Sequence, residues 1–430
     1  MREMKDSGID WIGTIPQDWQ LSKIGNLYTQ RNEKVSDKDY QPLSVTMQGI
    51  LPQLATAAKT DDGDNRKLVR VGDFAINSRS DRRGSCGISP LDGSVSLINI
   101  ILTPRTAMHP GYYNWLFHTT LFADEFYKWG HGIVADLWTT RWQEMKSITV
   151  PVPEYAEQER IAAFLDAECA EIDAVLEKTS ASIEEYKKLK QAVITQAVIK
   201  GIRGDRPMKD SGIEWIGEIP AEWDVVRQKY FWNTVESGVS VNAADKPVDN
   251  SEQYGVLKTS AVSKFVFIPT EHKQVNLEEY GRVSCPVRAD SIIASRMNTP
   301  ELVGACGYVQ NNYPNLFLPD RLWQITFKDG LSPKYAWYYL SGIRVRQYIS
   351  SLSTGTSSSM QNISQSQYGN IFITIPSVEE QSEITKYLDE KCRSVDALVA
   401  KKQQYLTEIE NYKKSLIYEY VTGKKEVHPL

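Results

Sequence analysis

The chain has 430 residues, a formal net charge of −5, and 41% hydrophobic and 24% charged residues. This length predicts two to four structural units, and the composition excludes a disordered or collagen-like chain. The acidic balance excludes a uniformly basic, histone-like protein.

The first recognisable element, residues 4–19, occurs twice. It reads MKDSGIDWIGTIPQDW, and residues 208–223 read MKDSGIEWIGEIPAEW, with four differences in sixteen positions. Residues 110–200 also align without a gap with residues 333–423. Because the offset grows from 204 to 223, the second intervening region is 19 residues longer. The chain is therefore a tandem duplication in which a similar frame surrounds two dissimilar regions.

The two dissimilar regions show the same mixture of patterns. Alternating apolar runs predict strands, and aromatic-rich helices are predicted just after Pro110 and Pro333. The expected strands are residues 43–45, 73–76, 97–102, 291–294 and 322–327, and the expected helices contain residues 112–117 and 335–340. Each repeat is therefore predicted to be an α+β unit.

Each repeat ends in a predicted long helix, over residues 158–200 and 381–422. Neither stretch contains glycine or proline, and apolar residues recur in steps of three and four, as in a coiled coil. The first seam is Ile161, Leu165, Cys169, Ile172, Leu176, Thr179, Ile183, Tyr186, Leu189, Val193 and Ala197. The second is Ile384, Leu388, Cys392, Val395, Val399, Lys402, Leu406, Ile409, Tyr412, Leu416 and Tyr420.

Because the seams match position for position, we expect one intramolecular antiparallel pair with a pseudo-two-fold axis. Thr179 and Lys402 would form a polar layer near its midpoint. Alternatively, each helix packs flat on its own domain. The predicted modules are residues 1–154, 155–203, 204–377 and 378–430, in the order domain, helix, domain, helix.

Signatures of catalytic and cofactor sites are missing. The chain has no Pro-Pro dipeptide, GxGxxG, GxxxxGK[ST] or HExxH pattern. Glu185-x-Lys187 resembles the end of a nuclease motif, but in a coiled-coil helix it is more typical of a solvated face. The five cysteines form no CxxC pair, so we expect reduced, buried thiols. We therefore predict no catalytic residue, cofactor or metal in this chain.

The duplicated KDSGIxWIGxIPxxW segment, the IPxP or IPS stretch before Glu-Gln, and the helices ending in VIKG or VTGK resemble the specificity subunits of type I restriction-modification systems. The resemblance covers both halves from Met4 to Lys424. It implies a non-catalytic DNA-reading subunit with two target-recognition domains, each reading half of a bipartite site, and helices that act as a ruler.

The resemblance also implies the partners: two modification subunits, restriction subunits for cleavage, and double-stranded DNA. S-adenosylmethionine, ATP and Mg²⁺ would belong to the partner subunits. We expect a cytoplasmic protein without a membrane partner, because no run approaches the roughly 20 apolar residues of a membrane span and the N-terminus has no leader pattern.

Candidate DNA contacts lie in polar loops of the two dissimilar regions, residues 20–154 and 224–377, which carry net charges of +1 and +2. Arginine suits guanine edges and phosphates, and asparagine suits adenine. In every case the alternative is a solvated loop or a self-neutralised turn. The predicted contacts are Arg66, Lys67, Arg79, Arg82, Arg83, Arg141, Arg296, Asn298, Thr356, Ser357, Gln361 and Asn362.

Tryptophans 11, 19, 215 and 223 recur with the frame, so we interpret them as packing residues rather than base-stacking residues. Two other classes of function remain open. One is a protein-interaction adaptor that does not read DNA, and the other is a self-contained nuclease-methylase.

Overall fold

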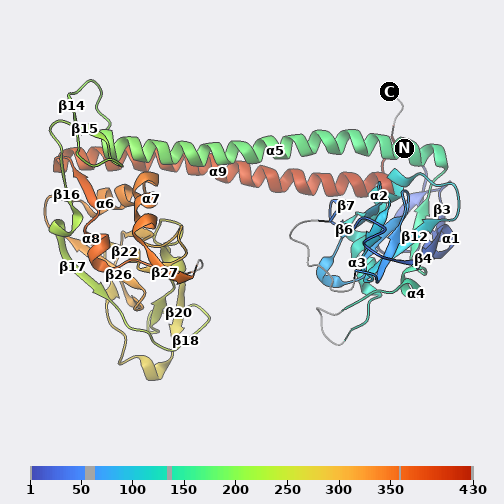
Figure 1. The fold of residues 1–430 in the computed structure, drawn as a ribbon, viewed down its shortest axis with the longest axis horizontal. Coiled ribbons are helices and arrows are strands. Elements are labelled where there is room, and N and C mark those ends of the chain that lie inside the picture. The colour runs from blue at the N-terminus through green and yellow to red at the C-terminus, as the bar shows by residue number, and fades with distance from the viewer. Residues whose placement is uncertain (1, 54–62, 133–137, 358–359, 428–430) are drawn as a thin grey trace. The chain divides into compact units, whose positions relative to one another are not determined.

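The computed structural model describes residues 2–53, 63–132, 138–357 and 360–427, which divide into two compact units (Figure 1). The first unit comprises residues 1–180 and 403–430, and the second comprises residues 181–402. Each unit therefore contains one dissimilar region and one half of each long helix. The module boundaries predicted at residues 154, 203 and 377 follow the order of elements along the chain and stay a prediction.

The long helices are α5 (Tyr155–Lys200) and α9 (Val378–Val421). The other elements of the first unit are β1 (Met4–Asp6), β2 (Thr14–Pro16), β3 (Gln20–Lys23), α1 (Ile24–Leu27), β4 (Tyr28–Arg31), β5 (Lys34–Val35), β6 (Leu43–Thr46), β7 (Gly49–Pro52), β8 (Arg66–Val69), β9 (Phe74–Asn77), η1 (Ser80–Arg82), β10 (Cys86–Ile88), β11 (Gly93–Val95), β12 (Asn99–Pro104), α2 (Pro110–Phe117), α3 (Thr120–Lys128), α4 (Trp142–Met145) and β13 (Thr149–Val152).

The second unit contains β14 (Met208–Asp210), β15 (Glu218–Pro220), β16 (Asp224–Arg227), η3 (Gln228–Phe231), β17 (Trp232–Ser237), β18 (Ala243–Ala244), β19 (Gly255–Leu257), η4 (Thr259–Val262), β20 (His272–Val275), η5 (Leu277–Glu279), β21 (Pro286–Val287), β22 (Ser291–Ser295), β23 (Met297–Asn298), β24 (Cys306–Val309), β25 (Tyr313–Phe317), β26 (Leu322–Phe327), α6 (Pro333–Ser341), α7 (Ile343–Leu352), β27 (Thr354–Ser357), β28 (Met360–Asn362), α8 (Gln365–Gly369) and β29 (Phe372–Ile375).

Each unit is built on a similar antiparallel four-stranded sheet, so the predicted α+β fold is confirmed. The strand order is β10-β9-β12-β4 in the first unit and β24-β22-β26-β17 in the second. The central strands β9 and β22 are buried along their whole length, which explains their uninterrupted apolar sequences. The second unit also has a five-stranded sheet, β18-β20-β19-β25-β21, where the first has the three-stranded β11-β8-β5.

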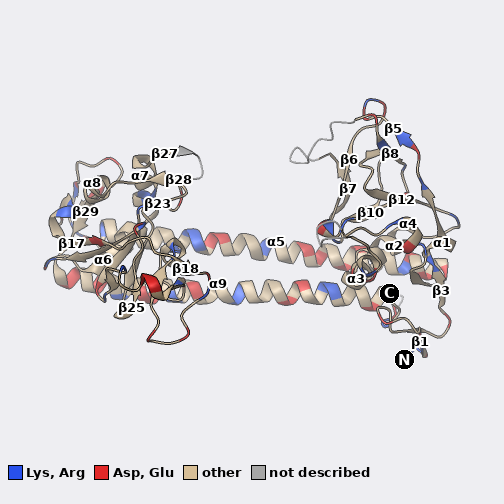
Figure 2. Cartoon of the chain, turned by 90° about the horizontal axis from the view of Figure 1, so that it is seen from below, with Lys and Arg blue, Asp and Glu red and all other residues tan. Residues whose placement is uncertain are grey.

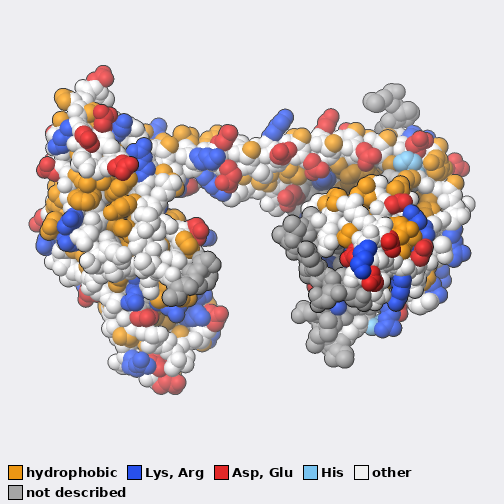
Figure 3. Space-filling model, in the orientation of Figure 1, with side chains coloured by type: hydrophobic (Ala, Val, Ile, Leu, Met, Phe, Trp, Pro, Cys, Tyr) orange, Lys and Arg blue, Asp and Glu red, His pale blue; other side chains and the backbone are white. Residues whose placement is uncertain are grey.

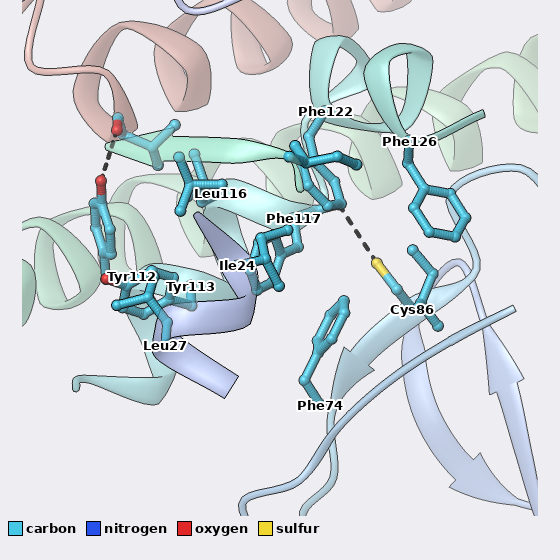
Figure 4. Packing of buried hydrophobic residues seen from close by; sticks show 14 of the residues in the cluster. Ile24, Leu27, Phe74, Cys86, Tyr112, Tyr113, Leu116, Phe117, Phe122 and Phe126 are labelled. Carbon is cyan, nitrogen blue, oxygen red and sulfur yellow. Dashed lines mark hydrogen bonds between the residues drawn. The ribbon is translucent and has the colours of Figure 1, made fainter. Parts of the chain in front are cut away.

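Aromatic side chains fill the core of the first unit between its sheet and helices α2 and α3 (Figure 4). The ring of Phe117 lies 4.5 Å from that of Phe74 and 4.7 Å from that of Phe122, measured between centroids. Pro110 and Pro333 occupy the first turns of α2 and α6, as predicted, because proline has the backbone angle that a helix start requires. All five cysteines are buried free thiols, which confirms that prediction.

Helices α5 and α9 lie side by side and antiparallel within each unit (Figures 1 and 2). In the first unit Lys413 Nζ lies 2.6 Å from Asp173 Oδ1, and in the second Lys190 Nζ lies 2.6 Å from Asp396 Oδ2. These two ion pairs are equivalent under the offset of 223. The alternative in which each helix packs only on its own domain is therefore wrong.

Most of the predicted seam is at least partly covered. The side chains that are buried or half-buried include Ile161, Leu165, Ile172, Leu176, Ile183, Ile384, Leu388, Val395, Val399 and Leu406. The prediction is wrong at Leu189 and Tyr412, which are 49% and 51% exposed. Leu189 and Tyr412 each follow two successive steps of three residues, from Ile183 and from Leu406. Because a helix turns about 100° per residue, two such steps carry the side chain backward around the helix and out of the stripe. The polar layer of Thr179 and Lys402 stays a prediction.

The repeated KDSG segment forms a two-stranded hairpin in both units, β1 with β2 and β14 with β15. Gly8 and Gly212 adopt φ of +69° and +72°, which explains why glycine stands there. Their backbone N–H groups donate to Asp6 and Asp210, each at 3.0 Å. The hairpin places a tryptophan against the first turn of a long helix.

A buried carboxylate joins this hairpin to the helix. Trp223 Nε1 donates to Glu380 Oε2 at 2.9 Å, Arg206 pairs with Glu380 Oε1, and the Arg206 guanidinium carbon lies 4.9 Å from the Trp223 ring. Trp19 donates to Glu157 in the same way at 2.8 Å. The prediction that these two tryptophans pack the frame is confirmed.

A tyrosine in each unit holds the end of the other long helix. In the first unit Tyr112 Oη donates to the carbonyl of Val421 at 2.8 Å, a contact visible in Figure 4. In the second unit Tyr335 Oη donates to the carbonyl of Val198 at 3.1 Å. Each unit therefore contains the start of one long helix and the end of the other. Within the described part of the chain, no helix combines the length and apolar character needed to cross a bilayer.

Replacing Glu380 by alanine should lower the free energy of unfolding by about 3 kcal/mol, because it leaves the buried Trp223 N–H without its acceptor and leaves Arg206 with Glu222 as its remaining ion-pair partner. Urea denaturation followed by tryptophan fluorescence would measure this. Glu383 is the matched control, since its pair with Arg203 is exposed, and Glu383→Ala should change stability by no more than about 0.5 kcal/mol. Equal effects of the two substitutions would contradict the assigned role of Glu380.

Candidate nucleic-acid interface

Two loops that are distant in the sequence meet in the first unit. Residues 78–83 follow strand β9 and contain η1, and residues 138–141 precede α4. Ser80 N donates to the Trp138 carbonyl and Thr140 N to the Ser78 carbonyl, both at 3.0 Å, and Arg79 forms a bridge with Thr139. The sequence treated these loops as separate candidates, whereas the structure joins them.

The joined loops form one wall of a shallow pocket to which Arg79, Arg141 and Lys67 all contribute. Arg79 and Arg141 are exposed, and neither forms an ion pair with a described residue. These two guanidinium groups therefore remain available for a ligand. Part of the predicted second loop, residues 133–137, lies outside the described residues.

The remaining arginines of the loop have acidic neighbours. Arg82 Nε lies 3.8 Å from Asp81 Oδ2, and Arg83 pairs with Asp124 on α3. Both arginines are exposed, so these pairs are screened and weak. The structure therefore places Arg82 and Arg83 at the surface of the first joined loop, and their contact with DNA stays a prediction.

The prediction that Arg66 meets a phosphate is wrong. Arg66 lies in strand β8 and is buried, and its guanidinium donates to the hydroxyl and the carbonyl of Ser94, each at 2.9 Å. Lys67 points the other way, and its ammonium donates to the Asn99 carbonyl at 2.7 Å. Burial lowers the pKa of both side chains. The alternation of a strand explains the difference, since neighbouring residues face opposite sides.

The second unit gathers its predicted contacts on one small sheet. Strands β23, β28 and β27 pair in that order, with Asn298 opposite Gln361 and Met297 opposite Asn362. Thr356 and Ser357 lie in β27, so the backbone brings them to the same sheet. Residues 358–359 of the predicted loop lie outside the described residues.

Arg296 lies beside this sheet and lines a pocket with Thr354, Asn362 and Gln367. Arg296 is half-buried. Its backbone carbonyl accepts a hydrogen bond at 3.0 Å from the N–H of Ile363, the residue that follows strand β28. Asn298 Oδ1 accepts from Thr299 N at 2.9 Å. Sequence reasoning missed Gln367, although the capping pattern that it forms with Ser364 before α8 is legible in the sequence.

The arginines of the two units are not structurally equivalent. At the offset of 223, Ile100 of β12 corresponds to Trp323 of β26. Ile76 of β9 lies opposite Ile100, and Ala294 of β22 lies opposite Trp323, so Ile76 corresponds to Ala294, 218 positions later. The sequence alignment of Arg79 with Arg296 uses an offset of 217, so the structure instead matches Arg79 with Met297. A shift of one residue along extended backbone exchanges the two faces, so the units present arginine at different places.

The described residues contain no cluster of His, Cys, Asp and Glu that could hold a metal ion. The long helices carry both signs of charge, with Lys and Arg interspersed among Asp and Glu (Figure 2). The candidate residues of each unit carry guanidinium, amide or hydroxyl groups at the edge of a sheet. Such groups can form hydrogen bonds to base edges and phosphates.

Comparison with known proteins finds similar sequences. A model described as Type I restriction modification DNA specificity domain matches residues 220–410. The chain is 24% identical to the Type I restriction enzyme MjaVIII specificity subunit of Methanocaldococcus jannaschii, over 97% of this chain and 95% of that protein. It is 20% identical to the EcoKI specificity subunit of Escherichia coli K12, over 96% of this chain and 90% of that protein.

Solved structures share the fold. A chain from a structural study of complex assembly and conformational transition of the type I R-M system matches with a TM-score of 0.70 and 16% identity, over 96% of this chain and 99% of that one. The HsdS subunit of Thermoanaerobacter tengcongensis matches with a TM-score of 0.51 and 17% identity, over 96% and 98%. Residues 110–200 align with residues 333–423, most of which lie within the matched segment.

Replacing Arg66 by methionine should lower the free energy of unfolding by about 2 kcal/mol, because the substitution keeps the apolar stem but leaves the Ser94 carbonyl without a donor. Arg82→Ala, at an exposed position of the same unit, should change it by less than about 0.5 kcal/mol. Chemical denaturation of the two variants beside the parent chain would measure both. A destabilised Arg82→Ala with an unaffected Arg66→Met would reverse the assignment.

Proposed function

We propose, from the premise that the chain belongs to the specificity subunits of type I restriction-modification systems, that each of its two units reads one half of a bipartite DNA target. Recognition of a DNA target is the role of this family. The proposal of two half-sites rests on the duplicated frame, which holds two dissimilar regions, residues 20–154 and 224–377. We call these the reader regions.

The reader regions differ in the way that two half-sites of different sequence require. The first unit offers the guanidinium groups of Arg79 and Arg141 beside Lys67, and the second offers Arg296 with the amides of Asn298 and Asn362. Arginine pairs with guanine and with phosphate, and asparagine with adenine. Direct readout by these groups would give each unit its own base preference.

The helices carry exposed apolar residues at equivalent positions. Val175 and Leu189 of α5 are exposed apolar residues, and so are their counterparts on α9, Leu398 and Tyr412. Apolar side chains also lie among the charges of the helices in the space-filling view (Figure 3). Two equivalent apolar surfaces fit two copies of one partner, which supports docking of two identical modification subunits.

As a specificity subunit the chain is the non-catalytic component of a larger complex. We propose that the modification subunits bring S-adenosylmethionine for adenine methylation, and that restriction subunits bring ATP and Mg²⁺ for cleavage. The exposed apolar positions also favour a second candidate, an adaptor that binds protein but does not read DNA. The following experiment separates the two.

The purified complex with modification subunits should bind DNA that contains its target more tightly than a scrambled duplex. Arg296→Ala should lower the specific affinity by about tenfold, as expected for a base or phosphate contact. Arg203→Ala is the control, because it removes one exposed arginine of the same unit outside the reader region. Affinities that are equal for target and scrambled DNA would favour the adaptor.

The length of the helices should set the gap between half-sites. Residues 174–180 of α5 and residues 406–412 of α9 lie at facing positions of the helix pair, next to the Asp173–Lys413 ion pair. Deleting both segments removes one heptad from each helix and shortens the pair by about 10 Å. Mapping of methylated sites should then show a gap that is shorter by about three base pairs, at 3.4 Å per base pair. Glu177→Ala, within the deleted stretch, should leave the gap unchanged. A gap that is unaltered by the double deletion would refute the ruler.

A further inference from the structure

One buried hydroxyl holds the reader loop of the first unit from behind. Tyr127, on the last turn of α3, is 6% exposed, and its hydroxyl lies 3.1 Å from the carbonyl of Asn77 and 3.3 Å from that of Arg82. These carbonyls bracket Arg79. The backbone of Tyr127 also accepts from Trp138 Nε1 at 2.8 Å, so the same turn of α3 holds both joined loops.

A buried guanidinium performs the corresponding task in the second unit. Arg346 on α7 is 7% exposed, and its Nη2 lies 2.6 Å from the carbonyl of Val303 and 3.2 Å from that of Glu301. This loop follows strand β23, which carries Asn298, and it returns to the sheet through a hydrogen bond from Gly304 N to Ser295 O at 2.7 Å. Ser295 immediately precedes Arg296.

The guanidinium of Arg346 is held under unusual conditions. Its Nε and Nη1 have no hydrogen-bond partner among the described residues, and it forms no ion pair with any of them. Its central carbon lies 5.0 Å from the Phe265 ring. Burying a charge costs free energy unless hydrogen bonds or an ion pair offset it. For Arg346 the hydrogen bonds that the structure shows are those to the two loop carbonyls.

The two buttresses are different residues at different places of a similar frame. Under the offset of 223, Tyr127 corresponds to Ser350, and Arg346 corresponds to Ala123. Neither unit therefore contains the buttress of the other. Each belongs with the loop that it supports, as the reader residues do, rather than with the shared frame.

We propose that Tyr127 and Arg346 are positioning residues that fix the backbone of the reader loops and thereby set the base preference of each half-site. This inference rests on the proposed function. Bidentate contacts to a base edge tolerate only small displacements of the side chain that makes them. A loop released from its buttress keeps its arginine and asparagine but presents them in several positions, so wrong bases are accepted more readily.

The test uses the purified complex and a DNA library in which both half-sites are randomised, with sequencing of the methylated molecules. Tyr127→Phe removes only the hydroxyl and should lower base discrimination in one half-site about fivefold. Arg346→Met should lower it about tenfold in the other half-site. Arg346→Lys, which can still reach one carbonyl, should retain part of the discrimination and serves if the methionine variant does not fold.

Tyr113→Phe and Tyr339→Phe are matched controls, because both hydroxyls are buried without a hydrogen-bond partner in the described structure. They should leave both half-sites unchanged. The inference is wrong if Tyr127→Phe and the Arg346 variants affect both halves equally, or lower the melting temperature while discrimination is kept. A parent complex with no preference in either half would instead refute the proposed function, so the two failures can be told apart.

Discussion

The interaction on which each unit depends is the docking of a tryptophan and an arginine onto a glutamate in the first turn of a long helix. The arginine is Arg2 in the first unit, where Glu157 is half-buried, and Arg206 in the second, where Glu380 is buried. Glu157 and Glu380 are the only acceptors that the structure shows for the indole N–H groups of Trp19 and Trp223 among the described residues. Because Tyr112 and Tyr335 hold the end of the other helix, each core is closed by chain segments from both helices. Each unit therefore needs chain segments from both halves of the sequence.

This interlocking explains which parts of the sequence are free to differ. The hairpins, the Glu-Gln pairs and the helix ends are needed twice in the same geometry, so they recur. Gln158 and Gln381, for example, each accept a hydrogen bond from the backbone just before an aromatic helix, at 2.8 Å in both units. The loops between the sheet and the helices carry none of this constraint, and they differ in length, charge and backbone register.

Much of the fold could be predicted because the sequence contains a tandem duplication, and each half supports the interpretation of the other. The duplication located the hairpins and the helices, and short apolar runs located β9, β22 and β26. The errors have local physical causes. Two successive three-residue steps turn Leu189 and Tyr412 out of the seam, and the alternation of β8 turns Arg66 inward while Lys67 stays at the pocket. The meeting of the two loops in each unit could not be predicted, since it depends on tertiary hydrogen bonds.

The same limit applies to specificity. Arg79 and Arg296 look equivalent in the sequence, but the register of their sheets places them one residue apart, and different side chains support the two loops from behind. We therefore expect the direction of a contact side chain to depend on its position on the strand, on the neighbouring loop and on the proposed positioning residue. Transplanting contact residues alone from one unit to the other would move the chemical groups without the backbone that aims them, and a half-site preference would not be transferred with them.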